Sequence, residues 1–259
     1  MREMLGVAIE AAKEAGKILK ENLGKSIEIG FKGEINLVTD IDITSEKTIV
    51  HIIRNKYPDH QILTEEGEGH KGTPSHKWII DPLDGTTNYA HGYPCFCVSI
   101  AFEKNGNILF GVIYDPVLDE LFTAEKGGGA CLNGRKIRAS STDKLIHSML
   151  ATGFPYDLRE SQNNNLIHFN NFTMSAQAIR RAGSAALDLC YVAMGRFDGF
   201  WELKLSPWDV AAGSLIVREA GGMVSDFKGG VFDIYSKEIL ASNGKIHYEM
   251  VEVLKREVV

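Results

Sequence analysis

The stretch KWIIDPLDGTTN, residues 77–88, places two carboxylates directly after an apolar run. The apolar run is typical of a buried strand, and Pro82 ends it because proline has no N–H to donate to a sheet. Gly85 permits a sharp turn, and the threonines after it can cap a short helix. Asp81 and Asp84 therefore lie close together at a strand end, where their like charges repel one another unless a cation lies between them.

Length and composition are those of a globular protein. With 259 residues, 44% of them hydrophobic and 24% charged, the chain can bury a sizeable core. We expect one structural unit over residues 1–259, which could divide into an N-terminal half, 1–142, and a C-terminal half, 143–259. The net charge of −6 argues against a nucleic-acid partner, which would require a basic surface.

Targeting and redox signals predict a cytoplasmic protein. The chain has no apolar run of about 18 residues, so the sequence predicts no membrane span. Acidic side chains within residues 1–24 indicate a mature amphipathic helix rather than a signal peptide. The four cysteines form no CxxC pair and fit small buried side chains in a reducing compartment. The eight histidines show no zinc-binding spacing.

Hydrophobic periodicity predicts helices interleaved with strands in both halves of the chain. Helices are expected over residues 2–22, 44–57, 183–195 and 206–222, and from about residue 245 onward. Strands are expected over residues 61–64, 77–81, 96–103, 108–114, 120–124, 223–227 and 238–242. The polar segments 139–144 and 157–165 are expected to be exposed loops. This pattern indicates a layered α/β (α+β) fold.

Carboxylates elsewhere in the chain could complete a metal site with Asp81 and Asp84. Glu65 follows an expected strand, and Asp209 lies in the first turn of an expected helix. Hard oxygen ligands of this kind select Mg²⁺, and the N–H groups after the DPLD turn would face a bound phosphate. The residues alone leave open that Asp209 is only a helix cap and that Glu65 lies in a solvated turn. Gly213, within the same helix as Asp209, indicates the close approach of another backbone.

Two long motifs carry a resemblance to a known family. WIIDPLDGTTN (78–88) together with PWDVAAG (207–213) resembles the inositol monophosphatase family, in the bacterial branch of the lithium-sensitive, Mg²⁺-dependent phosphatases. Supporting motifs occur in the family's order, namely NLVTDID (36–42), LTEEG (63–67), GSAALDL (183–189), GFWE (199–202) and REAGG (218–222). The resemblance covers nearly the whole chain. It implies a layered α-β-α-β-α sandwich of the sugar phosphatase type and a homodimer.

The resemblance also implies a role for each matching residue. The residues expected to hold two or three Mg²⁺ ions are Glu65, Asp81, Asp84, Asp209 and the main-chain carbonyl of Leu83. The residues expected to act in catalysis are Thr86, which would orient the attacking water, Glu65, and Asp42, which would hydrogen-bond to Thr86. The residues expected to bind substrate are Leu83, Asp84, Gly85, Thr86, Gly183, Ser184, Ala185, Glu202 and Asp209. Lys32 is similar to the lysine of the family's metal loop, and the short segment between Glu65 and Asp81 implies a reduced lid.

The function that the resemblance implies is Mg²⁺-dependent hydrolysis of inositol-1-phosphate by in-line attack of a metal-activated water. Fructose-1,6-bisphosphate or another sugar or nucleotide phosphate is an alternative, because Arg180 and Arg181 could reach a second phosphate. A haloacid-dehalogenase mechanism fits less well, since the spacing is DxxDGT rather than DxDxT. An alternative of a different class is a regulatory partner of transcription or RNA-processing machinery.

Overall fold

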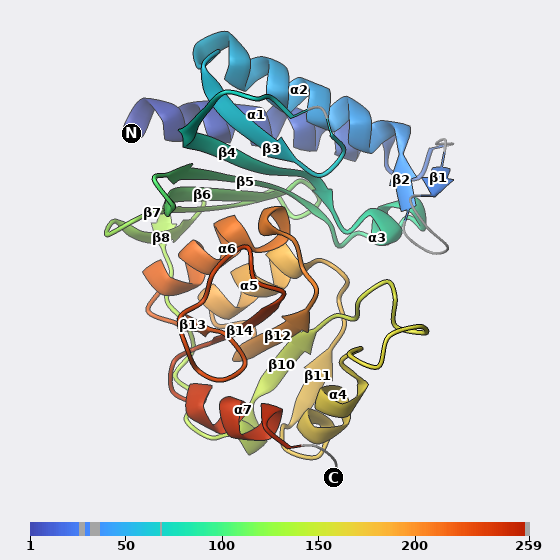
Figure 1. Ribbon diagram of the computed structural model, residues 1–259, viewed down its shortest axis with the longest axis vertical. Coiled ribbons are helices and arrows are strands. Elements are labelled where there is room, and N and C mark those ends of the chain that lie inside the picture. The colour runs from blue at the N-terminus through green and yellow to red at the C-terminus, as the bar shows by residue number, and fades with distance from the viewer. Residues whose placement is uncertain (26–28, 32–36, 68, 257–259) are drawn as a thin grey trace.

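Helical and sheet layers alternate through the whole molecule. The computed structural model describes residues 1–25, 29–31, 37–67 and 69–256, so Lys32 lies outside the described residues. From one end of the long axis to the other, the order is helices, sheet, helices, sheet, helices (Figure 1). The predicted α-β-α-β-α sandwich is therefore confirmed.

The N-terminal part forms the first helical layer and a seven-stranded sheet with strand order β3-β4-β5-β6-β7-β8-β9. The helices of this part are α1 (Arg2–Asn22), α2 (Asp40–Lys56) and the short α3 (Thr86–Ala90). Its strands are β3 (His60–Thr64), β4 (Thr73–Asp84), β5 (Cys97–Lys104), β6 (Asn107–Asp115), β7 (Glu120–Glu125), β8 (Gly129–Leu132) and β9 (Arg135–Lys136). Strand β3 runs parallel to β4, and the other neighbours pair antiparallel. A separate pair joins β1 (Ile29–Phe31) to β2 (Leu37–Thr39).

The C-terminal part contributes the middle helices, a five-stranded sheet and the outer helices. The sheet has the order β11-β10-β12-β14-β13. Its strands are β10 (Met149–Thr152), β11 (Ala178–Arg180), β12 (Gly199–Leu203), β13 (Met223–Ser225) and β14 (Glu238–Ser242). Helices α5 (Ala185–Ala193) and α6 (Pro207–Glu219) lie between the two sheets, while α4 (Leu166–Thr173) and α7 (His247–Leu254) cover the far face. A 3₁₀ turn, η1 (Leu145–His147), precedes β10.

The central hydrophobic cluster joins both sheets to the middle helices. It takes Ile79 from the first sheet and Phe200 from the second, so residues 1–142 and 143–259 share this core. Helix α6 lies against the first sheet at Gly111, where a Cβ would come within 2.8 Å of the Cα of Ala212. The close backbone approach predicted at Gly213 is not found, because its nearest neighbour is the side chain of Leu189 in α5. Tight α5–α6 packing therefore explains that glycine.

Several element boundaries differ from those predicted. Helix α2 begins four residues earlier than the apolar pattern indicated, because Thr39 and Asp42 form a capping box at its start. The strands β10 and β11 escaped prediction because each is too short to show a period. The segment 157–165 is not uniformly exposed, since Asn165 is 2% exposed. Among the described residues, no helix has the length and apolar character needed to span a bilayer.

Candidate active site

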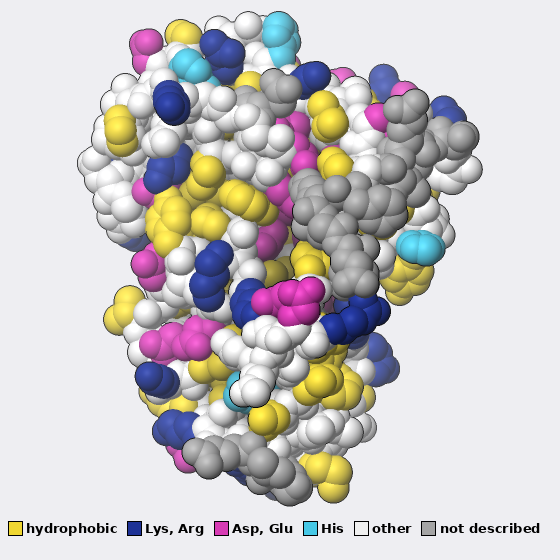
Figure 2. All heavy atoms as spheres, turned by 45° about the vertical axis from the view of Figure 1, so that its right-hand side comes forward, with side chains coloured by type: hydrophobic (Ala, Val, Ile, Leu, Met, Phe, Trp, Pro, Cys, Tyr) yellow, Lys and Arg dark blue, Asp and Glu magenta, His cyan; other side chains and the backbone are white. Residues whose placement is uncertain are grey.

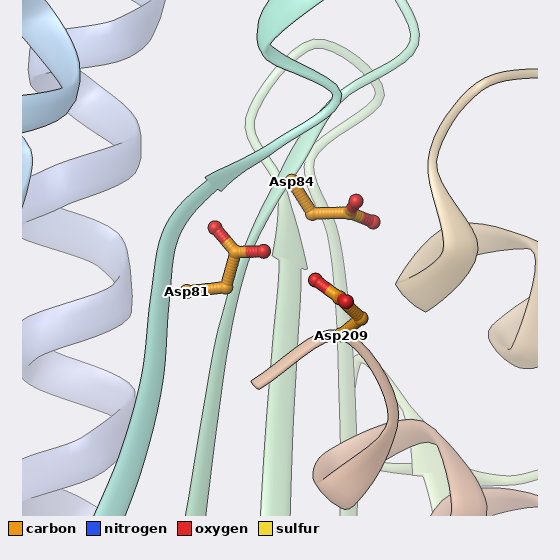
Figure 3. A group of neighbouring side chains, drawn as sticks. All are labelled: Asp81, Asp84 and Asp209. Carbon is orange, nitrogen blue, oxygen red and sulfur yellow. The ribbon is translucent and has the colours of Figure 1, made fainter. Parts of the chain in front are cut away.

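The end of β4 bends sharply where the DPLDGT motif lies. Asp81 pairs with Ser99 on β5, and the regular pairing then breaks until Asp84 meets Cys97. Gly85 follows with a φ of 99°, and a Cβ there would approach the carbonyl oxygen of Cys95 to 2.9 Å. The irregularity turns both carboxylates toward the same side of the strand (Figure 3). The motif therefore needs both the break in pairing and a glycine.

Asp209 brings a third carboxylate to this point from a distant part of the chain. The side-chain oxygens of Asp81, Asp84 and Asp209 all lie within 4.8 Å of one another (Figure 3). Asp209 is also a cap, because its Oδ2 accepts the N–H of Ser206 at 2.6 Å and Pro207 occupies the first helical position. The cap and ligand interpretations of Asp209 are therefore compatible, since one carboxylate has oxygens for both.

The electrostatics of this cluster favour a bound cation. Burial, and then the charges of Glu65, Asp84 and Asp209, raise the pKa of Asp81 well above its usual range. The pKa of Asp209 is raised by burial and by Asp84 and Glu65. Burial raises the pKa of Asp84 to about 6, although the Ser184 hydroxyl donates to it at 2.5 Å and the Ala186 N–H at 2.8 Å. An all-carboxylate donor set of this kind fits a hard divalent cation, whose charge would offset the repulsion.

Glu65 and Leu83 lie at the edge of the same cluster. Because β3 is parallel to β4, its end brings Glu65 to the edge of the sheet where β4 delivers Asp81. Glu65 lines the same cavity, but its oxygens are not among the mutually close set found in the described part of the chain. Leu83 is 1% exposed, and its N–H donates to Asp81 Oδ1 at 3.0 Å. Its carbonyl oxygen lies 3.1 Å from the hydroxyl oxygen of Thr86.

A chain of hydrogen bonds connects Thr86 to the start of α2. The Thr86 hydroxyl donates to Asp42 Oδ1 at 3.1 Å. The other oxygen of Asp42 accepts the N–H of Thr39 at 2.8 Å and also the Thr39 hydroxyl. Burial raises the pKa of Asp42, while the hydrogen bonds from Thr39 and Thr86 oppose that rise. Asp42 is 1% exposed, so a helix cap holds a catalytic threonine candidate in a fixed orientation.

The three carboxylates line a cavity of about 540 Å³. The predicted substrate residues Gly183, Ser184, Ala185 and Glu202 all line it. Glu202 is 8% exposed, and a Cβ at Gly153 would overlap its carboxylate. The hydroxyl of Ser184 is directed to Asp84, so it supports a metal-ligand candidate instead of pointing freely into the cavity. In Figure 2, acidic side chains gather in a hollow near the middle of the face, with lysine and arginine side chains below it.

Several residues of the site were not found from the sequence. Asn88 donates to the carbonyls of Cys95 at 2.7 Å and Ala182 at 2.8 Å, which ties α3 to the Gly183 turn. Tyr156 also lines the cavity, although it is 55% exposed. The Lys204 ammonium lies 2.5 Å from Asp157 Oδ2, and this ion pair anchors the segment that carries Tyr156. Asn88 ends the DPLDGTTN motif but gave no sign of its partners, and Tyr156 and Lys204 lie in no motif, because the contacts of all three join chain segments that meet only in the fold.

Comparison with known proteins places the chain in one family. A sequence profile described as the inositol monophosphatase family matches residues 1–258. The chain belongs to the inositol monophosphatase family. It is 42% identical over 256 residues to an inositol-1-monophosphatase of Mesorhizobium japonicum, covering 98% of this chain and 96% of that protein. The predicted family membership is therefore confirmed.

Two further relatives show that proteins similar to this chain carry different names. The chain is 43% identical over 261 residues to the Nus factor SuhB of Escherichia coli strain K12, covering 100% of this chain and 98% of that protein. An inositol monophosphatase structure from Anabaena superposes with a TM-score of 0.90 at 46% identity, covering 98% of this chain and 95% of that one. The chain is thus a phosphatase of a metal-dependent family, and relatives of similar identity carry either the name inositol-1-monophosphatase or the name Nus factor SuhB.

Proposed function

We propose that this protein is a Mg²⁺-dependent phosphomonoesterase that hydrolyses inositol-1-phosphate to inositol and phosphate. The observation that carries the proposal is the meeting of Asp81, Asp84 and Asp209, three carboxylates from two distant segments, on one wall of a cavity. Glu202 lines the same cavity and is an acceptor for hydroxyl groups. A cavity that holds both a cation-binding cluster and a hydroxyl acceptor suits a phosphorylated polyol.

The residues that would hold two or three Mg²⁺ ions are Glu65, Asp81, Asp84, Asp209 and the carbonyl of Leu83. Ions bound there would neutralise phosphate charge and lower the pKa of a coordinated water. The backbone N–H groups of Gly85 and Thr86, at the start of α3, would donate to the phosphate. The Thr86 hydroxyl, fixed by Asp42, would align the attacking water, and Glu65 would assist it.

Binding of the polyol is assigned to the cavity wall beyond the phosphate. The turn at residues 183–185 and the Glu202 carboxylate would contact the hydroxyl groups of the leaving alcohol. Gly153 makes room for Glu202, because any side chain at that position would displace the carboxylate. The cavity volume of about 540 Å³ accommodates a six-carbon polyol phosphate.

The test is a metal titration combined with a substrate panel. Protein stripped with a chelator is expected to be inactive and to recover with Mg²⁺, whereas Ca²⁺ should inhibit because it prefers more ligands and a looser geometry. The panel contains inositol-1-phosphate, fructose-1,6-bisphosphate, glycerol-2-phosphate and adenosine 3′,5′-bisphosphate. The highest kcat/KM is expected for inositol-1-phosphate. Full turnover in chelator, or a clear preference for a bisphosphate, would contradict the proposal.

A second candidate substrate is a sugar bisphosphate. Arg181 lines the cavity and lies over the ring of Phe154 at 5.7 Å, where its guanidinium could pair with a second phosphate. Arg180 is exposed and is not part of the cavity lining. If a bisphosphate is the substrate, Arg181→Ala should raise its KM far more than Arg180→Ala, the matched control. Equal effects of the two variants would remove this candidate.

A role in transcription is a candidate of a different class, favoured by relatives at 43% identity that are named Nus factor SuhB. The variant Asp209→Asn separates the two candidates, since it should abolish hydrolysis without changing a docking surface. Retention of a transcription phenotype by that variant would show a role independent of catalysis. Assembly as a homodimer, inhibition by Li⁺ and a cytoplasmic location belong to the proposal. Light scattering, an inhibition assay and cell fractionation test them in turn.

A further inference from the structure

One carboxylate on the cavity wall has no part in the site described so far. Asp188 lies in α5, and its side chain is 1% exposed. Its neighbours in the helix, Leu187 and Leu189, are fully buried in the central hydrophobic cluster. Burying a carboxylate in such surroundings is costly unless it gains partners. The helix therefore carries an acid that its own packing does not require.

A comparison with Asp115 shows how unusual Asp188 is. In the described part of the chain, both aspartates have a buried oxygen without a hydrogen-bond partner, Oδ2 in Asp115 and Oδ1 in Asp188. Asp115 has a structural role, because its Oδ1 accepts the N–H groups of Val117 at 2.8 Å and Leu118 at 3.0 Å. Asp188 lines the cavity, whereas Asp115 does not. A buried acceptor at a cavity wall is satisfied either by an ordered water or by a donor of the molecule that fills the cavity.

The position of Asp188 indicates which part of a substrate it would meet. It is not one of the aspartates whose oxygens converge at the cation cluster. Asp188 and Glu202 line the same cavity, and burial followed by the charges of Glu202 and Asp84 raises the pKa of Asp188. Asp188 and Glu202 are therefore carboxylates of the cavity lining that lie outside the cation cluster, so they are available to the leaving alcohol.

We propose that Asp188 is a specificity-determining residue that, together with Glu202, binds two hydroxyl groups of the leaving alcohol. Carboxylate oxygens accept hydrogen bonds from hydroxyl groups, so the pair favours alcohols with two free hydroxyls. A leaving group without hydroxyls leaves Asp188 unpaired, and a second phosphate in the same place would be repelled. The inference rests on the proposed phosphatase function and adds a selectivity that the known motifs do not provide.

The test compares Asp188→Asn with the parent on three monoesters, all in Mg²⁺. Inositol-1-phosphate and glycerol-2-phosphate carry hydroxyl groups on the leaving alcohol, whereas phenyl phosphate carries none. The ratio of kcat/KM for inositol-1-phosphate to that for phenyl phosphate is expected to fall on the order of 10- to 100-fold. The loss should appear mainly in KM. The matched control, Asp115→Asn, should keep this ratio within about twofold of the parent.

Each outcome decides the inference. An unchanged ratio in Asp188→Asn, or equal losses on all three esters, would overturn it and indicate a structural role. If the Tm shows that Asp188→Asn does not fold, the same ratio of kcat/KM values is measured on Asp188→Ser instead. If the parent hydrolyses glycerol-2-phosphate and phenyl phosphate but not inositol-1-phosphate, the proposed substrate is wrong. The ratio between the two remaining esters then still tests Asp188.

Discussion

Replacing Thr86 with alanine tests the hydrogen-bond chain that leads from α2 to the cavity. The substitution removes one hydroxyl, which donates to Asp42 Oδ1 at 3.1 Å and lies equally close to the carbonyl of Leu83. It leaves every carboxylate of the cation cluster in place. Thr86→Ala is therefore expected to bind Mg²⁺ and substrate nearly as well as the parent.

The expected loss is in turnover. Without the hydroxyl, nothing in this chain of contacts fixes the orientation of the attacking water relative to the phosphate. Positioning and proton-transfer contributions of this kind are worth on the order of 10²- to 10⁴-fold in kcat. Asp42→Asn should cost less, because Thr86 still lies near the Leu83 carbonyl at 3.1 Å. The double variant should lose less than the product of the two single losses, since both act through one hydrogen bond.

The expected loss of stability is small by comparison. Asp42 loses one hydrogen bond, but its other oxygen keeps the Thr39 N–H at 2.8 Å and the Thr39 hydroxyl. A hydrogen bond to a charged group is worth about 1.5–3 kcal/mol, and the lower end applies because Asp42 stays partly satisfied. For a chain of this size, that loss lowers Tm by roughly 3–6 °C.

The assay measures kcat, KM and Tm on Thr86→Ala and on Thr86→Ser, which keeps the hydroxyl. The serine variant should retain most of the activity, whereas the alanine variant should not. A kcat of Thr86→Ala within about threefold of the parent would refute the reasoning, because positioning losses start near 10²-fold. The water would then be aligned elsewhere, with Glu65 as the remaining candidate.

Three further predictions follow from the site. Asp209→Asn should abolish turnover at saturating Mg²⁺ while keeping the Tm near that of the parent, because the side-chain oxygen of an asparagine at this third helical position can still accept the Ser206 N–H of the capping box; retained turnover would show that Asp209 is a cap only. Burial raises the pKa of Asp84 to about 6 from 3.8, so the folded chain binds this proton more tightly than the unfolded chain. Metal-free protein should therefore gain stability as the pH falls from above 6 toward 3.8, and saturating Mg²⁺ should weaken or reverse that gain, as Tm measured across pH with and without chelator would show. Gly153→Ala should raise the KM for inositol-1-phosphate more than that for phenyl phosphate, because the added Cβ would overlap the Glu202 carboxylate; an equal rise for both esters would count against a polyol role for Glu202.

Local sequence patterns predicted most of the helices, including the ends of the helices that carry residues of the site. Ser184 and Gly195 mark the two ends of α5, and Ser206 with Pro207 marks the start of α6. These signals are readable because caps and turns depend on backbone geometry within a few residues. The carboxylates at 81 and 84 could be singled out for the same reason, since two like charges three residues apart after a strand need an explanation.

Only the tertiary structure decided which residues face one another across the cavity. Asp188 stands in an apolar helix, and the sequence does not say whether its carboxylate meets solvent, a cap or a ligand. Two other contacts likewise join segments that are distant in the sequence. Asn165 accepts a hydrogen bond from Trp201, and Lys204 donates one to Asp157. Such contacts depend on how α5, α6 and the two sheets pack, which is set by many side chains at once. Short-range patterns therefore singled out Asp81 and Asp84, and the family resemblance pointed to Gly183, Ser184, Ala185 and Glu202, whereas only the packing of distant segments showed that Tyr156, Asp188 and Lys204 line the same cavity.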